Sequence, residues 1–236
     1  MNKKDFILEL SKLNIKVTNE ELEKLEIYCK FLIEYNSHTN LTSIVEEELV
    51  YLKHFYDSLT IAKALDLNKY KTLLDIGTGA GFPGMVIKIF YPHLKITLLD
   101  SNRKKTIFLN QLAKKLDIKD NLYIINARSE DYIREKREYF DIVTSRGVAD
   151  LKILLELSLP FTKLGGYIIP LKGNIKEELE SSKKTINLLG GRLSNIINFR
   201  LPFENSNRNI IVIKKNHLTP SQYPRSYNLI IKKPLK

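Results

Sequence analysis

The spacing of apolar residues changes once along the chain, close to residue 70. Before that point apolar residues recur about every three to four positions, which is the period of a helix. A capping box from Thr18 to Glu21 predicts the start of one helix, the polar stretch 35–42 predicts its end, and another helix is predicted from about Glu46. We therefore expect residues 1–70 to form an N-terminal helical extension.

From residue 71 onward, short apolar runs alternate with amphipathic segments, which is the pattern of a doubly wound parallel sheet in an α/β fold. Strands are predicted at 72–76, 95–99, 122–126, 140–144 and 167–171, the last after a tight turn at Gly165–Gly166. Helices are predicted at 83–90, 103–116, 131–138, 150–159 and 175–189. An antiparallel hairpin is expected to close the sheet with strands 192–200 and 209–215, and the basic tail from Asn216 is expected to lie on the surface.

A glycine-rich turn follows the first predicted strand. Asp75 lies at the end of that strand, and Gly77, Gly79 and Gly81 follow at alternate positions. Glycine adopts positive φ without strain and lets a ligand approach the backbone closely. Phe82 stands where the dinucleotide fingerprint G-x-G-x-x-G needs its third glycine. This spacing favours S-adenosylmethionine (AdoMet) over a dinucleotide as the ligand.

Polar residues cluster where the predicted parallel strands end, and ligands of open parallel sheets bind at that edge. They are Asp75, Asp100, Ser129, Glu130, Arg146 and Lys172. Asp100 follows the second strand, where a carboxylate can accept hydrogen bonds from both hydroxyls of a ribose. As an alternative, Asp100 could cap the next helix, although Ser101 or Asn102 could do so equally well.

The sequence lacks the motifs of two common methylation chemistries. It contains no [Asp/Asn]-Pro-Pro-[Tyr/Phe] run for an exocyclic base amine, and Cys29 alone cannot supply the pair used in C5 methylation of a pyrimidine. Guanine N7 needs neither, because its lone pair carries no proton that must be removed, and alignment with the methyl donor suffices. The sequence therefore favours N7 chemistry, with Arg146 and Lys172 as the candidate catalytic residues.

Composition indicates the kind of partner, whether a metal is bound and where in the cell the protein acts. A formal net charge of +11 and a pI near 9.5 indicate a polyanionic partner, although lysines can also simply solvate a surface. One cysteine and four scattered histidines do not form a metal-binding pattern, so no metal is expected. No apolar run approaches the length of a membrane span or a signal peptide, so we expect a cytoplasmic protein without membrane contact.

The segment 74–84, Leu-Asp-Ile-Gly-Thr-Gly-Ala-Gly-Phe-Pro-Gly, resembles the AdoMet motif of the bacterial small-subunit rRNA guanine-N7 methyltransferases, the RsmG or GidB (glucose-inhibited division protein B) family. Four further segments are similar to signatures of that family, namely 40–44, 53–59, 145–149 and 219–225. The resemblance therefore extends over nearly the whole chain. Its departures are Ser129 and Gly147, where the family usually has alanine, and the run after Arg225, where the family has glycine and proline.

The resemblance implies a Rossmann-like class I methyltransferase fold, with a seven-stranded, mostly parallel sheet in residues 71–236 and the helical extension in front of it. It implies transfer of a methyl group from AdoMet to N7 of a guanine in 16S rRNA, near the ribosomal decoding region. Gly77 and Phe82 would line the AdoMet site, Ser129 and Glu130 would flank the adenine, and Arg146 would reach the cofactor or the mouth of the active site. Asp75, Gly79 and Asp100 complete the expected cofactor set.

The expected partner is 16S rRNA or the small ribosomal subunit, and the protein is expected to be a monomer. The candidates for RNA contact are Asn40, Lys53, His54, Arg128 and Lys172, each of which could equally be a solvated or capping residue. Two other functions stay open: a methyltransferase acting on a non-RNA substrate, and an RNA-binding ribosome-assembly module with a vestigial cofactor site. The intact glycines and carboxylates of the turn argue against the second.

Overall fold

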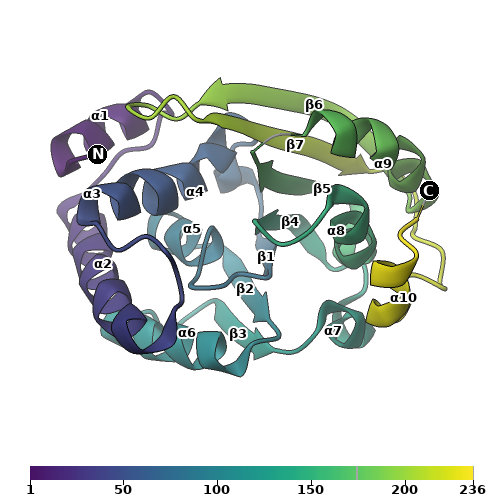
Figure 1. Cartoon of the computed structure of the whole chain (residues 1–236), viewed down its shortest axis with the longest axis horizontal. Coiled ribbons are helices and arrows are strands. Elements are labelled where there is room, and N and C mark those ends of the chain that lie inside the picture. Colours follow the sequence, from purple (N-terminus) through teal and green to yellow (C-terminus); the bar gives the residue numbers. More distant parts are fainter. Residues whose placement is uncertain (174, 236) are drawn as a thin grey trace.

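The computed structural model describes residues 1–173 and 175–235, which form one sheet covered by helices on both faces (Figure 1). The sheet has seven strands in the order β3-β2-β1-β4-β5-β7-β6. The first five strands are parallel, and β7 is antiparallel to both of its neighbours. The strands are β1 Thr72–Ile76, β2 Lys95–Asp100, β3 Leu122–Asn126, β4 Phe140–Arg146, β5 Thr162–Lys172, β6 Gly191–Arg200 and β7 Asn207–Lys215.

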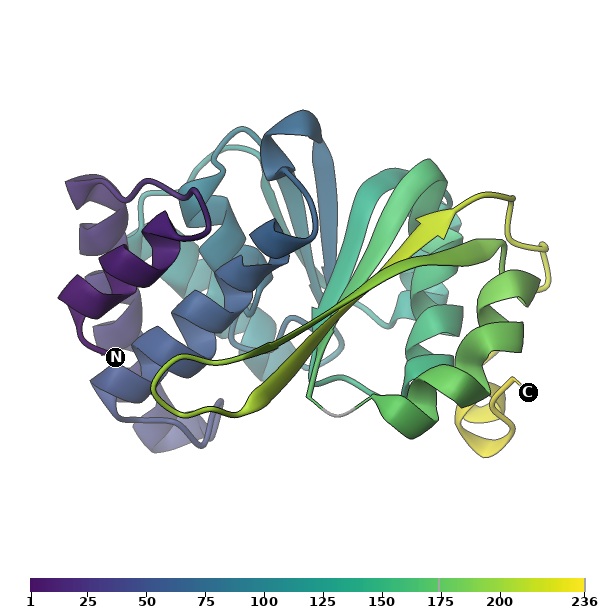
Figure 2. The ribbon, with the colours of Figure 1, turned by 90° about the horizontal axis from the view of Figure 1, so that it is seen from above.

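Two apolar clusters lie on opposite faces of the sheet, because successive strand residues point to opposite sides. In β1, Leu73 belongs to one cluster and Leu74 to the other, and both are fully buried. Figure 2 shows the helices of residues 1–70 on one side of the sheet and the helices near the C-terminus on the other. This burial on both faces explains why the parallel strands appear in the sequence as nearly continuous apolar runs.

The first face is covered by the N-terminal helices together with the two helices that follow β1 and β2. These are α1 Lys3–Ser11, α2 Asn19–Thr39, α3 Glu47–Leu49, a π-helical segment Val50–Tyr56, α4 Asp57–Leu59, 3₁₀ turns Thr60–Lys63 and Leu67–Lys69, α5 Gly84–Phe90 and α6 Arg103–Lys115. The predicted capping box of α2 is present at Thr18 and Glu21. Asn40 ends α2 at φ 50°, later than the polar stretch predicts, because the Asn36 amide bonds the backbone of Thr42 and the helix can continue to that point.

The second face is covered by α7 Ser129–Lys136, α8 Leu151–Ser158, a 3₁₀ turn Leu159–Phe161, α9 Lys176–Leu188 and α10 Tyr227–Lys232. The long β6–β7 hairpin reaches across to the N-terminal helices (Figure 2), where Glu204 in its loop forms an ion pair with Lys53 at 2.6 Å. No helix in the described part of the chain is long and apolar enough to cross a membrane.

One sequence prediction, the tight turn at Gly165–Gly166, needs correction. Gly165 and Gly166 lie inside β5, which begins at Thr162, and a register shift against β4 accommodates them. The C-terminal tail contains a helix and is anchored by buried groups, because the guanidinium of Arg225 is paired with Glu156, whose side chain is fully buried. Most residues of the tail are exposed, so it lies on the surface as expected, and this ion pair fixes its position there.

Candidate cofactor and substrate site

The turn between β1 and α5 is closely packed. Gly77 has φ 65°, and a Cβ atom there would approach a methyl group of Val148 to 2.7 Å. Gly81 has φ 102°, and a Cβ atom there would lie 2.6 Å from the hydroxyl of Tyr28. Both positions therefore require glycine for conformation and for space. The turn is fixed further where the Tyr28 hydroxyl donates to the carbonyl oxygen of Ala80 at 2.5 Å.

Asp75 lies at the base of this turn and is fully buried. Its Oδ2 accepts hydrogen bonds from the Thr78 hydroxyl at 2.6 Å and the Gly84 backbone N–H at 2.8 Å. Its Oδ1 is buried and has no partner among the described residues. Burial raises the pKa of Asp75 to about 7, against the opposing effects of these hydrogen bonds and of Arg146. Asp75 lines neither of the cavities described below, so in this structure its contacts fix the turn.

Asp100 ends β2, and both of its carboxylate oxygens are oriented by the backbone. Oδ2 accepts from the Gly79 N–H at 2.9 Å, and Oδ1 accepts from the Asn102 N–H at 2.8 Å. The following helix, α6, is capped by Asn102, whose side chain accepts from the Lys104 N–H. The alternative role of Asp100 as the helix cap is therefore wrong. A carboxylate can accept about four hydrogen bonds, so capacity for a ribose remains.

A cavity of about 120 Å³ lies beside Asp100 at the ends of β1, β2 and β3. It brings together four of the residues predicted to bind the cofactor, namely Gly77, Asp100, Ser129 and Glu130. Apolar side chains of the strands and of α8 form its floor, and Tyr227 of α10 forms part of its wall. A small apolar slot with carboxylates at its edge suits part of a nucleoside, an aromatic base beside a ribose.

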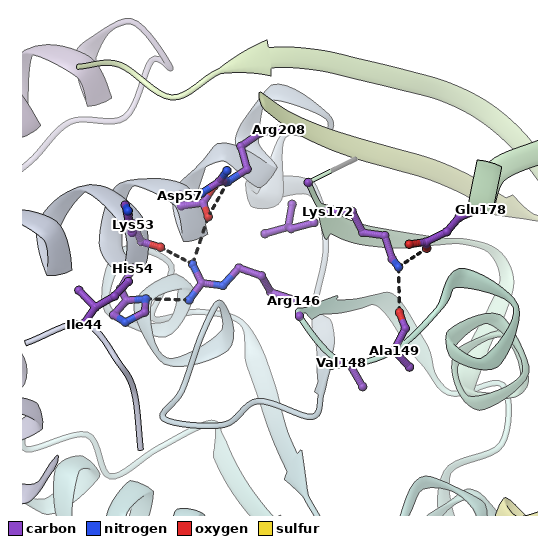
Figure 3. Close-up of a pocket in the computed structure, with 13 residues that line it drawn as sticks. Ile44, Lys53, His54, Asp57, Arg146, Val148, Ala149, Lys172, Glu178 and Arg208 are labelled. Carbon is purple, nitrogen blue, oxygen red and sulfur yellow. Dashed lines mark hydrogen bonds and ion pairs between the residues drawn. The ribbon is translucent and has the colours of Figure 1, made fainter. Parts of the chain in front are cut away.

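A second cavity of about 370 Å³ lies at the ends of β4 and β5 and faces the N-terminal helices (Figure 3). Both candidate catalytic residues, Arg146 and Lys172, line it, as do Lys53 and His54. Val148 lines this cavity and the first one as well, so the two adjoin at the loop after β4. A cofactor and a substrate can therefore meet at this loop.

Arg146 connects the sheet to the N-terminal helices (Figure 3). Its Nη1 donates to the Lys53 carbonyl at 2.6 Å and to Asp57 at 3.3 Å, and its Nη2 lies 3.1 Å from His54 Nδ1. The Lys53 carbonyl is accessible because the π-helical segment directs the Asp57 N–H to the carbonyls of His54 and Leu52. Burial lowers the pKa of Arg146, and the carboxylate of Asp57 opposes that effect.

Asp57 also accepts from Nε of Arg208, at 3.1 and 3.2 Å, so that two guanidinium groups share one nearly buried carboxylate. Neither Asp57 nor Arg208 was predicted from the sequence as a site residue. Asp57 lies in the segment 53–59, which carries part of the family resemblance, and that segment was the available signal. Arg208 has no local signal beyond a charged residue next to an otherwise apolar strand.

His54 is neutral at physiological pH, because burial and the charge of Arg146 lower its pKa to about 3. Since Arg146 only donates, His54 Nδ1 accepts, and Nε2 carries the proton that is directed at Thr42 Oγ1 at 2.9 Å. The His54 ring stacks on Phe82 at 4.3 Å, and Phe82 stacks on Tyr28 at 5.4 Å. Phe82 is buried in this stack and supports the glycine turn, outside the lining of either cavity.

The other predicted site residues have intramolecular partners. Lys172 donates to the Ala149 carbonyl at 2.8 Å and forms an ion pair with Glu178. Asn40 ends α2 outside the lining of both cavities. Arg128 lies beside the first cavity, with its guanidinium 4.4 Å from the ring centre of Tyr227. Contact of these residues with RNA stays a prediction. The described residues contain no cluster of side chains suited to hold a metal ion.

The strand order, the glycine turn after β1 and the carboxylate at the end of β2 define a class I AdoMet-dependent methyltransferase. The fold is similar to that of the tRNA (m1A58) methyltransferase TrmI from Aquifex aeolicus, with a TM-score of 0.54 and 16% identity over 68% of this chain and 69% of that one. The cofactor of the present protein is AdoMet, and the cavity beside Asp100 suits its nucleoside part.

The sequence profile of the GidB family, described as rRNA small subunit methyltransferase G, matches residues 21–211. The chain is 44% identical to the Ribosomal RNA small subunit methyltransferase G of Bacillus subtilis and 42% identical to that of Exiguobacterium sibiricum, over the full length of each. This protein therefore belongs to the rRNA small subunit methyltransferase G family, as its sequence motifs predicted.

Proposed function

We propose that this protein transfers the methyl group of AdoMet to N7 of a guanine in 16S rRNA, near the decoding region. The observation that best supports this proposal is that the two cavities adjoin at Val148. One cavity has the apolar slot and the ribose-binding carboxylate, Asp100, that a nucleoside cofactor needs, and the other is lined by cations. When bound, AdoMet supplies a methyl group activated by a sulfonium charge, and the residues below position the two reactants.

The second cavity favours a nucleophile that has no proton to lose. His54 is neutral with a pKa near 3, and both of its nitrogens are engaged. Asp57 is held by two arginines, and Glu178 is paired with Lys172. These are the described residues of the lining that could accept a proton, and none is free to do so. Guanine N7 needs no general base, and catalysis by positioning is sufficient for it.

Arg146 and Lys172 are suited to orient a guanine. Three hydrogen bonds engage Arg146 with the protein, which leaves two of the five N–H donors of a guanidinium for a substrate. Arginine and lysine commonly donate to guanine O6, and a donor directed at O6 leaves the N7 lone pair for the methyl group. We expect the enzyme to act as a monomer in the cytoplasm, on rRNA alone or in the small subunit.

The proposal is tested with labelled AdoMet and small-subunit rRNA or subunits from cells that lack the enzyme. We expect 7-methylguanosine as the product by nucleoside analysis, and loss of activity in Arg146→Ala. Arg192→Ala, which removes an exposed arginine of β6, is the matched control and should retain activity. A different methylated nucleoside would overturn the N7 assignment. AdoMet binding without transfer to any RNA would favour a non-RNA substrate, and no AdoMet binding would favour the assembly module.

A further inference from the structure

The C-terminal tail contributes a wall to the smaller cavity. Tyr227, the first residue of α10, lines it together with Asp100, Ser129 and Glu130, although these residues lie far from α10 in the sequence. We propose that the ring of Tyr227 contacts the adenine of AdoMet and is a cofactor-positioning residue supplied by the tail. This inference rests on the proposed placement of the cofactor at Asp100.

The ring is held in one orientation by Arg128, which lines the same cavity. The guanidinium of Arg128 lies 4.4 Å from its centre, which is cation–π geometry. Arg128 directly precedes Ser129, so the same short segment that carries the predicted adenine contacts also carries the stacking partner of Tyr227. Arg128 and Tyr227 line the cavity together, so the stacked pair forms part of its wall. The aromatic surface of Tyr227 that the guanidinium leaves open can contact an adenine base.

The backbone next to Tyr227 is fixed to the protein interior. The N–H of Arg225 donates to Glu156 at 3.0 Å, and its guanidinium donates to both carboxylate oxygens at 2.7 and 2.6 Å. Glu156 lies on α8 and is fully buried. Burying a carboxylate is costly unless it is paired, so this contact holds the tail at one position. Tyr227, two residues further on, is thereby placed at the cavity.

A second set of bonds holds the tail before Arg225. The guanidinium of Arg137, which follows α7, donates to the carbonyls of Tyr223, Thr219 and Pro220 at 2.7, 2.8 and 3.1 Å. The tail is thus attached at α7 and α8, the two helices on either side of the cavity wall. Tyr227 itself is 36% exposed, so the ring can be replaced without opening the apolar core.

The inference is tested by calorimetry of the full-length protein with AdoMet and, separately, with adenosine. Tyr227→Ala should weaken both by about tenfold, the scale of a base stacked on an aromatic ring. Tyr227→Phe keeps the ring and should bind as the wild type does. Tyr139→Ala is the control, because Tyr139 has the same kind of stack with Lys136, also at 4.4 Å, and does not line the cavity. Arg128→Ala should give an intermediate loss.

Unchanged binding in Tyr227→Ala, together with weakened binding in Asp100→Asn, would overturn the role of Tyr227 and leave the proposed function standing. A loss with AdoMet but not with adenosine would overturn the adenine contact, and a loss in Tyr227→Phe equal to that in Tyr227→Ala would overturn stacking by the ring. Wild-type protein that binds neither ligand, or Asp100→Asn protein that binds as the wild type does, would overturn the placement of the cofactor and this inference with it.

Discussion

Replacing Asp75 by asparagine should remove one pH-dependent contribution to folding. The folded protein raises the pKa of Asp75 from 3.8 to about 7 through burial. Between these values the folded state keeps a proton that the unfolded state releases, so this contribution to stability is full below pH 3.8 and is lost as the pH rises to 7. At about 1.4 kcal/mol per pH unit, and with the group half ionised at pH 7, the loss between pH 5 and pH 7 is about 2 kcal/mol.

The measurement is urea unfolding of the wild type and Asp75→Asn without ligand at pH 5, 6, 7 and 8. The wild type should lose about 2–3 kcal/mol relative to the variant between pH 5 and pH 8, because asparagine still accepts from Thr78 and Gly84 and does not titrate. His54 acts in the opposite direction: its pKa is lowered, so its contribution is full above pH 6.5 and is lost as the pH falls towards 3. This contribution is common to both proteins and cancels in the difference.

Asp141→Asn is the matched control. The pKa of Asp141 is lowered by its hydrogen bonds to Lys163, Lys71 and Thr72, although burial opposes them. Its contribution is therefore present above pH 3.8 and constant from pH 5 to 8, so this variant should show a loss of stability that does not vary with pH. An Asp75→Asn difference that is equally flat would refute the raised pKa and the reasoning from burial.

Three further predictions concern the tail, the glycine turn and the extension. Arg225→Ala should lower the free energy of unfolding by about 3–5 kcal/mol in urea titrations, because Glu156 is left buried and unpaired, and adding Glu156→Gln should recover part of the loss. Gly77→Ala should lower stability by more than about 1 kcal/mol and weaken AdoMet binding in calorimetry, because φ is 65° and Val148 occupies the space. Thr18→Ala should cost about 1 kcal/mol in the same titrations and leave rRNA methylation unchanged, because it removes only a helix cap.

The parallel half of the sheet was predictable because its determinants are local. A strand buried on both faces is a short apolar run, and the polar residue that follows it marks the carboxyl edge. Strands β1 and β3 begin and end at the predicted residues, and β2 and β4 begin where predicted. The same rule selected Asp75, Asp100 and Arg146 as candidate site residues. Of these, Asp100 and Arg146 each line one of the two cavities.

The remaining features depend on contacts between distant segments. Asp57 and Arg208 are 151 positions apart, and no local pattern shows that they pair, with Asp57 also bonded to Arg146. Phe82 stands next to the glycines in sequence, yet its ring is drawn into a stack with Tyr28 and His54 of the N-terminal helices. The glycine pair in β5 looks like a turn because its register against β4 is invisible in the sequence.

Part of the positive charge of the chain lies in the second cavity, between the sheet and the N-terminal helices. A net charge of +11 fits both a polyanionic partner and a merely solvated surface. In the described lining of the larger cavity, however, four cations stand against two carboxylates, and the cations are Lys53, Arg146, Lys172 and Arg208. Under the proposed function, this excess of positive charge attracts an anionic RNA to the cavity that would receive the target base. Lys53 comes from the N-terminal helices, Arg146 from β4 and Arg208 from β7. The N-terminal helices and the β6–β7 hairpin therefore each contribute a cation to the lining of this cavity.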